Sequence, residues 1–290
     1  KRILVAVPSL SLIRQTLQVW AEQSLANQQD INWIVVCSDQ SIDKASSLDT
    51  AVLTQDLGVQ IHTNTDEIAS WLRKSRKGTT VIFSTYQSGK AVAEASRKAK
   101  FTFDIGIMDE AHKTVGKQDS LFAHLLFEKN IKIRKRVFMT ATERLYRGKS
   151  DKIASMDDDE LYGDTFELLS FKEALECDPP ILSDYRIVTL FVTQDEIAKM
   201  VKQNLIVKPD KGKWNKDVEA DMLASLIALN KSIKQHPIKH AVSFHTTVAR
   251  ADAFRKSQAT FTDTYPEFHK LDTFHVSGAT ATAARAREIE

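Results

Sequence analysis

The chain has 290 residues, of which 42% are hydrophobic and 27% are charged, and its formal net charge is +2. This length and composition fit two globular domains and exclude a disordered or fibrous protein. No apolar run is long enough to span a membrane, no signal-peptide pattern opens the chain, and the distant Cys37 and Cys177 indicate neither a disulfide framework nor a zinc site. We therefore expect a cytoplasmic protein without a membrane partner.

In the first half of the chain, short runs rich in β-branched residues alternate with helical stretches. Strands are expected at residues 3–7, 33–37, 81–84, 103–108 and 136–139. Leu10, Ile13, Leu17 and Trp20 recur at helical spacing after the first of these strands. Continuous apolar strands joined by helical crossovers predict a doubly wound α/β domain, in which helices cover both faces of a parallel sheet.

The rest of the chain predicts a hinge and a second, smaller α/β domain. Pro179 and Pro180 interrupt any helix in the segment after residue 150. We place the first domain at 1–168, the hinge at 169–185 and the second domain at 186–290. Beyond the hinge we expect a long helix over 218–234, with Phe244 in the core, and strands at 186–192, 240–245 and 273–277.

Polar clusters follow four of the strands in the first half. They read "VPSLS", "STYQS", "DEAH" and "TATERL". Because parallel strands end at the same edge of a sheet, and α/β sheets bind ligands there, we expect these clusters to lie close together.

The "DEAH" cluster carries the residues best suited to nucleotide chemistry. At the end of a buried strand, Asp109 is suited to hold a magnesium ion, usually through water, that bridges nucleotide phosphates. Glu110 is suited to orient an attacking water. His112 can donate a hydrogen bond to the loop after the next strand. The three are therefore candidate catalytic residues.

With these motifs in view, the chain resembles the superfamily 2 helicases and translocases. The matching segments are "LVAVPSLSLIRQT" (motif Ia), "VIFSTYQS" (Ib), "MDEAH" (II), "MTAT" (III), "AVSFHTTVARADAF" (IV) and "FHVSGATATAARAREIE", which follows motif IV. Within the superfamily, "TYQS", "MDD..LYG" and "LSFKEAL...ILSDYRI" are most similar to the restriction-enzyme-type group. The resemblance implies two RecA-like domains, ATP and Mg²⁺ as cofactors, and DNA as partner, besides other subunits or fused domains of a restriction enzyme.

The resemblance also implies roles for individual residues. Thr140, Ala141 and Thr142 correspond to a coupling motif. The nucleic-acid-binding positions would be Pro8, Ser9, Thr85, Tyr86, Ser88, His245, Thr246, Thr247, Ser277 and Gly278. Their hydroxyl and backbone N–H groups would bind phosphates rather than bases, as a motor that moves over any sequence requires.

Several of these positions have a structural alternative. Ser9 and Thr85 are residue types that cap helices. Tyr86 could be a core aromatic residue with its hydroxyl at the rim. His245 could be a structural histidine at a strand end.

The family pattern is incomplete at both ends of this sequence. The 290 residues contain neither the family's Gly-rich phosphate-binding loop, whose place would be before Lys1, nor motifs V and VI with the arginine finger, whose place would be after Glu290. We therefore expect a first domain without its phosphate-loop start, a second domain incomplete at its C-terminus, and no ATP hydrolysis by the isolated chain.

Three functions follow from the sequence. The leading hypothesis is an ATP-dependent DNA helicase or translocase of a restriction-modification or related defence enzyme. The alternatives are an RNA helicase and a catalytically inactive nucleic-acid-binding module. A metal-dependent nuclease at Met156–Leu161 is disfavoured, because that acidic segment has no lysine or histidine partner at nuclease spacing.

Overall fold

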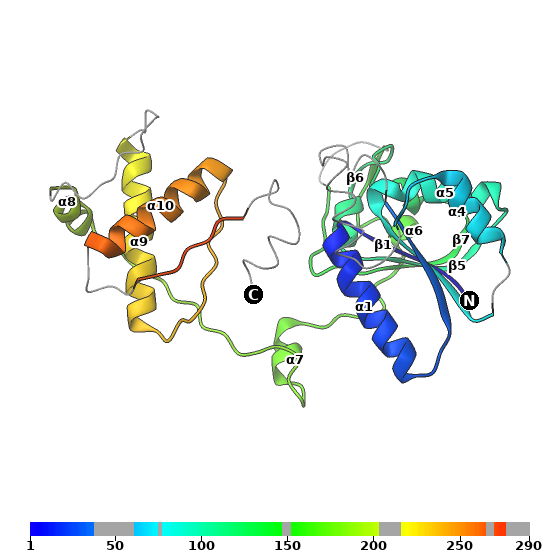
Figure 1. The fold of residues 1–290 in the computed structure, drawn as a ribbon, viewed down its shortest axis with the longest axis horizontal. Coiled ribbons are helices and arrows are strands. Elements are labelled where there is room, and N and C mark those ends of the chain that lie inside the picture. The colour runs from blue at the N-terminus through cyan, green and yellow to red at the C-terminus, as the bar shows by residue number, and fades with distance from the viewer. Residues whose placement is uncertain (38–60, 75–76, 147–151, 203–215, 265–269, 277–290) are drawn as a thin grey trace. The chain divides into compact units, whose positions relative to one another are not determined.

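The computed structural model describes residues 1–37, 61–74, 77–146, 152–202, 216–264 and 270–276. The chain divides into two compact units, Lys1–Leu168 and Leu169–Glu290. Figure 1 shows the helices and strands of each unit.

The first unit is built on a six-stranded sheet in the order β3-β2-β4-β1-β5-β7, in which all neighbours are parallel. Its strands are β1 (Arg2–Val7), β2 (Ile31–Val36), β3 (Ile61–His62), β4 (Thr79–Thr85), β5 (Phe103–Met108) and β7 (Ile133–Phe138). The five predicted strands and the parallel α/β sheet are thus confirmed. The two-residue β3 escaped prediction because it is too short to show a periodic pattern.

The two faces of the sheet carry separate hydrophobic cores. Helix α1 (Leu10–Ala26) covers one face, where Ile13 and Leu17 pack against Val5. Helices α4 (Thr65–Arg73) and α5 (Gly89–Lys98) cover the other, which includes Leu4. Figure 1 shows α1 on one side of the strands and the α4–α5 pair on the other. This two-sided cover explains why the central strands are apolar at successive positions.

The carboxyl ends of β4, β1, β5 and β7 lie next to one another. Val7 is level with Thr85, Ala6 with Met108, and Met108 with Phe138. The residues that follow these four strands therefore share one edge of the sheet, as the order of motifs predicts.

Short elements decorate this edge and the chain beyond it. They are the 3-10 helices η1 (Tyr86–Ser88), η2 (Ala111–Thr114) and η3 (His124–Leu126), the antiparallel pair β6 (Gly116–Lys117) and β8 (Ile153–Ala154), and helix α6 (Asp159–Tyr162). Among the described residues, no helix combines the length and apolar composition needed to cross a membrane.

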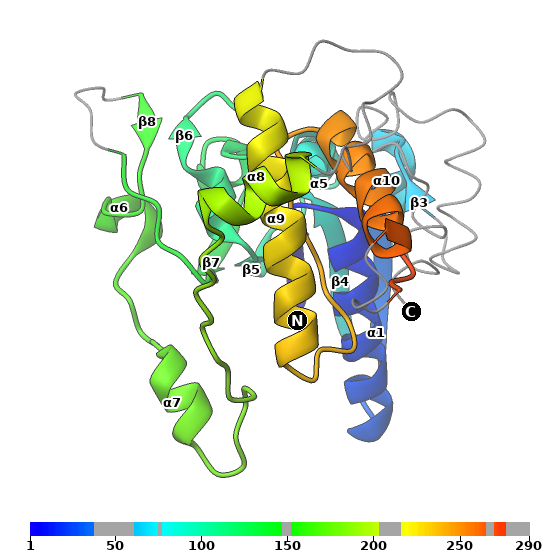
Figure 2. The ribbon, with the colours of Figure 1, turned by 90° about the vertical axis from the view of Figure 1, so that its left-hand side faces the viewer.

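The second unit is helical in the part that the structure describes. It contains α7 (Phe171–Glu176), α8 (Gln194–Lys202), α9 (Lys216–Gln235) and α10 (Val248–Thr264). Figure 2 shows α8, α9 and α10 from another side. Leu226 and Ile227 of α9 pack with Phe254 and Phe261 of α10 to form its core. The long helix predicted over 218–234 corresponds to α9.

The three strands predicted for the second unit do not form in the described residues. Residues 186–192, 240–245 and 273–276 have no strand assignment there, and residue 277 lies outside the described part. The prediction that Phe244 belongs to the core is wrong, because its side chain is 93% exposed. An apolar, β-branched run becomes a strand only when its backbone groups pair with a neighbouring strand, and the described residues of this unit provide no such partner.

Candidate active site

The turn that follows β5 carries Asp109 and Glu110 and is bonded to both neighbouring strands. The Asp109 N–H donates to the Ala6 carbonyl of β1 (2.9 Å), and the Ala111 N–H donates to the Met139 carbonyl after β7 (2.9 Å). Between these bonds, Glu110 has a left-handed backbone conformation with φ 50° and ψ 46°. This conformation costs a residue with a side chain about 1–2 kcal/mol. The neighbouring strands therefore hold Glu110 in a strained geometry, which is a common feature of functional sites.

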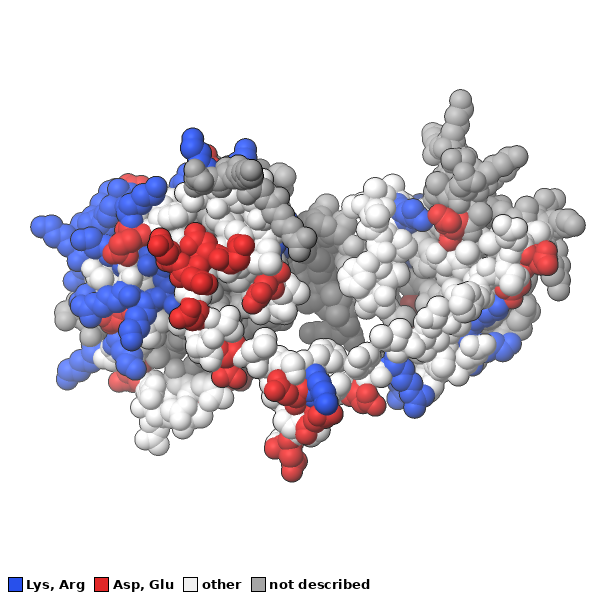
Figure 3. All heavy atoms as spheres, turned by 180° about the vertical axis from the view of Figure 1, so that it is seen from behind, with Lys and Arg blue, Asp and Glu red and all other residues white. Residues whose placement is uncertain are grey.

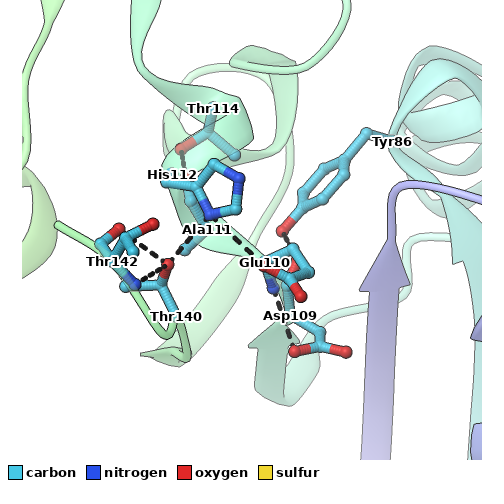
Figure 4. A network of polar contacts seen from close by, with 8 residues as sticks. All are labelled: Tyr86, Asp109, Glu110, Ala111, His112, Thr114, Thr140 and Thr142. Atoms are coloured by element: carbon cyan, nitrogen blue, oxygen red, sulfur yellow. Dashed lines mark hydrogen bonds and ion pairs between the residues drawn. The ribbon is translucent and has the colours of Figure 1, made fainter. Parts of the chain in front are cut away.

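The two carboxylates differ in their surroundings but both reach solvent. Asp109 is partly buried, and its Oδ1 accepts the Glu110 N–H at 2.9 Å. The Glu110 side chain is 38% exposed. Figure 4 shows one oxygen of Asp109 bonded within the turn and the other pointing away from it. A ligand at this edge of the sheet can therefore reach both carboxylates.

His112 connects the turn after β5 with the loop after β7. Its Nδ1 lies 2.9 Å from Thr140 Oγ1 and 3.3 Å from Glu110 Oε2 (Figure 4). The Thr140 hydroxyl donates its only proton to the Thr142 carbonyl at 2.9 Å. Thr140 Oγ1 must then accept from His112, so we assign a proton to Nδ1 of the imidazole. The structure thus brings Glu110, His112, Thr140 and Thr142 into one chain of polar contacts, in which Glu110 is joined by an ion pair and the others by hydrogen bonds. Ala141 between the threonines is exposed.

The donor set at Asp109 fits a magnesium ion held mainly by other ligands. Mg²⁺ keeps several waters and binds through one or two carboxylates together with substrate phosphates. Two adjacent, solvent-accessible carboxylates at residues 109 and 110 meet that requirement. No group of three His, Cys, Asp or Glu side chains suited to a metal occurs in the described residues, which excludes an all-protein cage from that part of the chain.

The structure places the side chains of Thr85, Tyr86 and Ser88, which are predicted to bind nucleic acid, in the interior of the first unit. All three are buried, and the Thr85 and Ser88 hydroxyls bond to each other at 2.8 Å. Tyr86 is fully buried, and its hydroxyl donates to the Asp109 carbonyl at 2.7 Å. Burial, reinforced by the nearby Asp109 carboxylate, raises the pKa of Tyr86, which keeps the donor proton in place. Tyr86 is therefore a core aromatic residue that supports the turn.

The other positions predicted to bind nucleic acid in the first unit, Pro8 and Ser9, are partly exposed. Ser9 is the N-cap of α1, and its Oγ accepts the Leu12 N–H at 3.4 Å. Capping uses the hydroxyl oxygen as an acceptor. The Ser9 hydroxyl proton is not needed for the cap.

In the second unit, the predicted positions lie before and at the start of α10. His245 is partly buried, with its ring 4.9 Å from that of Phe254 between centroids, and its Nε2 lies 3.0 Å from Ser243 Oγ. Thr247 accepts the Arg250 N–H at 3.1 Å as a helix cap, while Thr246 is exposed. The remaining predicted positions, Ser277 and Gly278, lie outside the described residues.

Sequence reasoning missed one side chain that contacts this region, Tyr162. Its hydroxyl lies 2.8 Å from the hydroxyl of Thr114, the last residue of η2. Tyr162 belongs to the "MDD..LYG" segment that supports the family resemblance, but it lies far from the "DEAH" cluster in the sequence, and its spacing does not signal the contact.

The acidic segment at Met156–Leu161 lies on the surface of the first unit. Asp158 caps α6 by accepting the Leu161 N–H at 3.2 Å. Beside α6 lies a cavity of about 360 Å³, lined in part by Glu128, Arg136 and Asp159. Figure 3 shows acidic and basic side chains gathered in separate patches on this unit. These findings assign a capping role to Asp158 and support no nuclease site.

Residues 1–145, which contain the parallel sheet and the turn just described, match the family model described as "Type III restriction enzyme, res subunit". The chain belongs to this family. Its membership and its fold confirm the resemblance to the restriction-enzyme-type group of superfamily 2 helicases.

Two individual proteins illustrate the relationship. Over 176 residues the chain is 30% identical to "Probable helicase A859L" of African swine fever virus, an alignment that covers 60% of this chain and 17% of the viral protein. The solved structure of the ATP-dependent Type ISP restriction-modification enzyme LlaBIII bound to DNA matches with a TM-score of 0.68 at 23% identity, over 92% of this chain and 18% of LlaBIII. The LlaBIII match supports the RecA-like fold. The chain spans less than a fifth of the length of either relative.

Proposed function

We propose that the chain is the motor portion of an ATP-dependent DNA helicase or translocase in a restriction-modification or related defence enzyme. The observation that carries this proposal is the chain of contacts from Glu110 through His112 to Thr140. It joins the ends of two neighbouring strands at the edge where the carboxylates reach solvent. Such a connection can transmit a change at a bound nucleotide to the loop after β7.

In this proposal the residues of the turn have distinct roles. Bound ATP would supply the phosphoryl group that is transferred to water, and its magnesium ion would neutralise the negative charge of the phosphates. Asp109 would hold the magnesium ion through water. Glu110 would orient the attacking water from its fixed left-handed position, and His112 would hold the Glu110 carboxylate against the loop that contains Thr140. Thr140, Ala141 and Thr142 would then couple hydrolysis to movement.

DNA is the proposed partner, and backbone phosphates are the proposed contact. The LlaBIII structure contains bound DNA. Pro8 and Ser9 lie partly exposed after β1, at the same edge as Asp109. In the second unit, His245, Thr246 and Thr247 remain proposed contacts, together with Ser277 and Gly278. A motor that contacts phosphates rather than base edges can move along DNA of any sequence.

Replacing Glu110 by Gln in the protein that carries this chain tests the proposal. The change removes the charge that orients water but keeps the shape of the side chain. We expect DNA-stimulated ATP hydrolysis to fall by about 10²–10⁴-fold, with ATP binding retained. The measurements are turnover with duplex DNA, single-stranded DNA and RNA, and ATP affinity at equilibrium.

Glu22→Gln is the matched control, because Glu22 is an exposed glutamate in the second half of α1 and belongs to none of the motifs at the sheet edge. Its turnover should equal that of the unmodified protein. Unchanged turnover in Glu110→Gln would remove Glu110 from its role. If only RNA stimulates turnover, RNA rather than DNA is the partner. If the unmodified protein shows no turnover at all, the inactive binding module is favoured.

A further inference from the structure

Thr114 is a buried threonine whose hydroxyl is bonded on two sides. Its Oγ1 donates to the Ala111 carbonyl at 2.7 Å and lies 2.8 Å from the Tyr162 hydroxyl. A threonine hydroxyl has only one proton. Because that proton is used within η2, the Tyr162 hydroxyl must be the donor in the second bond. Tyr162 therefore holds η2 through a bond of defined direction.

The aromatic ring of Tyr162 packs against β7, the strand that precedes the loop with Thr140. Its centroid lies 4.9 Å from that of Phe138, the last residue of β7. Phe138 is followed directly by Met139 and Thr140. The ring thus packs on the strand that leads to Thr140, while the hydroxyl bonds the helix that contains His112.

The segment that carries Tyr162 is fixed in place by further contacts. Strand β8 pairs with β6, which lies just after η2. Ala154 of β8 is fully buried with Ala123 and Leu126, and Leu161 and Tyr162 pack against the same cluster. Burial raises the pKa of the Tyr162 hydroxyl, so the group remains a donor at neutral pH. Tyr162 is thus fixed both by its own packing against this cluster and by the preceding strand β8, which pairs with β6.

We propose that Tyr162 is a positioning residue for the candidate active site, holding η2 against β7 so that His112 keeps its bond to Thr140. Tyr162 lies only a few residues before Leu168, where the first unit ends. The same side chain therefore links the site to the segment that leads toward the second unit. The effect on turnover rests on the proposed function, whereas the effect on His112 geometry does not.

The first test measures His112 directly, in the chain with ¹⁵N-labelled histidine. NMR of the imidazole nitrogens reports which one carries the proton. We expect Nδ1 to be protonated in the unmodified chain, and we expect the His112 signals to change in Tyr162→Phe and in Thr114→Val. His245 serves as an internal reference, and Tyr146→Phe, which alters a 44% exposed tyrosine, is the matched control. Unchanged His112 signals in both Tyr162→Phe and Thr114→Val would overturn the proposal, whatever the activity.

The second test is a double-mutant cycle in the protein that carries this chain. Tyr162→Phe keeps the ring packing, so the midpoint of thermal unfolding should change little, while kcat for DNA-stimulated ATP hydrolysis should fall about three- to tenfold at a nearly constant KM. Because the two hydroxyls bond each other, Tyr162→Phe should have no further effect when Thr114 is already Val. Additive losses of kcat, or a loss equal to that in Tyr146→Phe, would overturn the positioning role.

The two proposals can fail separately. If Glu110→Gln leaves turnover unchanged while the His112 signals respond to Tyr162→Phe, the proposed function fails and the positioning role stands. If Glu110→Gln abolishes turnover while His112 is insensitive to Tyr162, the positioning role fails and the proposed function stands.

Discussion

The two units of the chain contain similar apolar, β-branched runs, but only the first unit makes strands of them among the described residues. Phe83 of β4 is fully buried, whereas Phe244, in a comparable run of the second unit, is 93% exposed. β4 has β1 on one side and β2 on the other. The segment around Phe244 has no strand beside it in the described part of the unit. A local sequence pattern thus favours a strand, but the strand forms only where a neighbouring strand pairs with its backbone groups.

The described part of the second unit is instead organised by helix packing. Apolar side chains of α9 and α10 form its core, and Asn230 and Gln258 form a buried pair between these helices. Each amide donates to the other, at 2.9 Å and 3.1 Å. Helical hydrogen bonds are internal to each segment, so this core needs no strand pairing.

Amide hydrogen exchange should separate the two units most strongly. In the first unit we expect the amides of β1 and β4 to exchange only by extensive unfolding, with protection factors above about 10⁴. Residues 187–191 and 241–244 should be protected by no more than about tenfold. Exchange measured by mass spectrometry on the intact chain checks this, and strong protection of the latter segments would show that they are paired.

A matched pair of phenylalanine substitutions should show the same difference between the two units in the free energy of unfolding. Phe83→Ala should lower the free energy of unfolding of the first unit by about 3–5 kcal/mol, because it leaves a cavity in the core. Phe244→Ala should change stability by less than about 0.5 kcal/mol, because its side chain is already in solvent. Urea denaturation measures both. Comparable losses in the two variants would contradict the exposure of Phe244, and Phe83→Leu offers a milder core change if Phe83→Ala does not fold.

The buried amide pair tests whether the helical core of the second unit is specifically packed. Asn230→Ala should destabilise this unit by about 1–3 kcal/mol, because the Gln258 amide loses its partner. Replacing both residues by Leu should cost less than Asn230→Ala, since no buried polar group is then left unpaired. Urea denaturation followed by a probe in the second unit distinguishes these variants. A larger loss in the double variant would mean that the pair does more than satisfy its own polar groups.

The sequence predicted most of the first unit and the edge of the sheet at which its candidate site residues meet. Strands β1, β2, β4 and β5 carry runs of apolar residues long enough to recognise, and β7 is recognisable from its last residues, Val137 and Phe138. The polar clusters at the strand ends converge because parallel strands end together. The exception is β3, which has only two residues. In the second unit the helix at α9 was predictable from its period, but the three strands were not, since pairing depends on residues distant in sequence.

Within the site, residue type was a weaker guide than position. Asp109, Glu110, His112 and Thr140 lie together because they follow neighbouring strands. Tyr86 lies at the same edge, yet its hydroxyl supports the Asp109 carbonyl from inside the core. A hydroxyl at a strand end can face solvent or the protein interior, and the sequence pattern is the same in both cases.

The amino-acid sequence by itself determined the parallel sheet, the edge at which its motifs meet and the family of the chain, because strand runs and motifs are local patterns. Only the tertiary structure decided that the hydroxyls of Tyr86 and Tyr162 bond to the segment Asp109–Thr114, and that the strand-like runs of the second unit lie unpaired in the described residues. Burial, strand pairing and the direction of a hydroxyl bond all depend on which distant segments come into contact, and no local pattern records that.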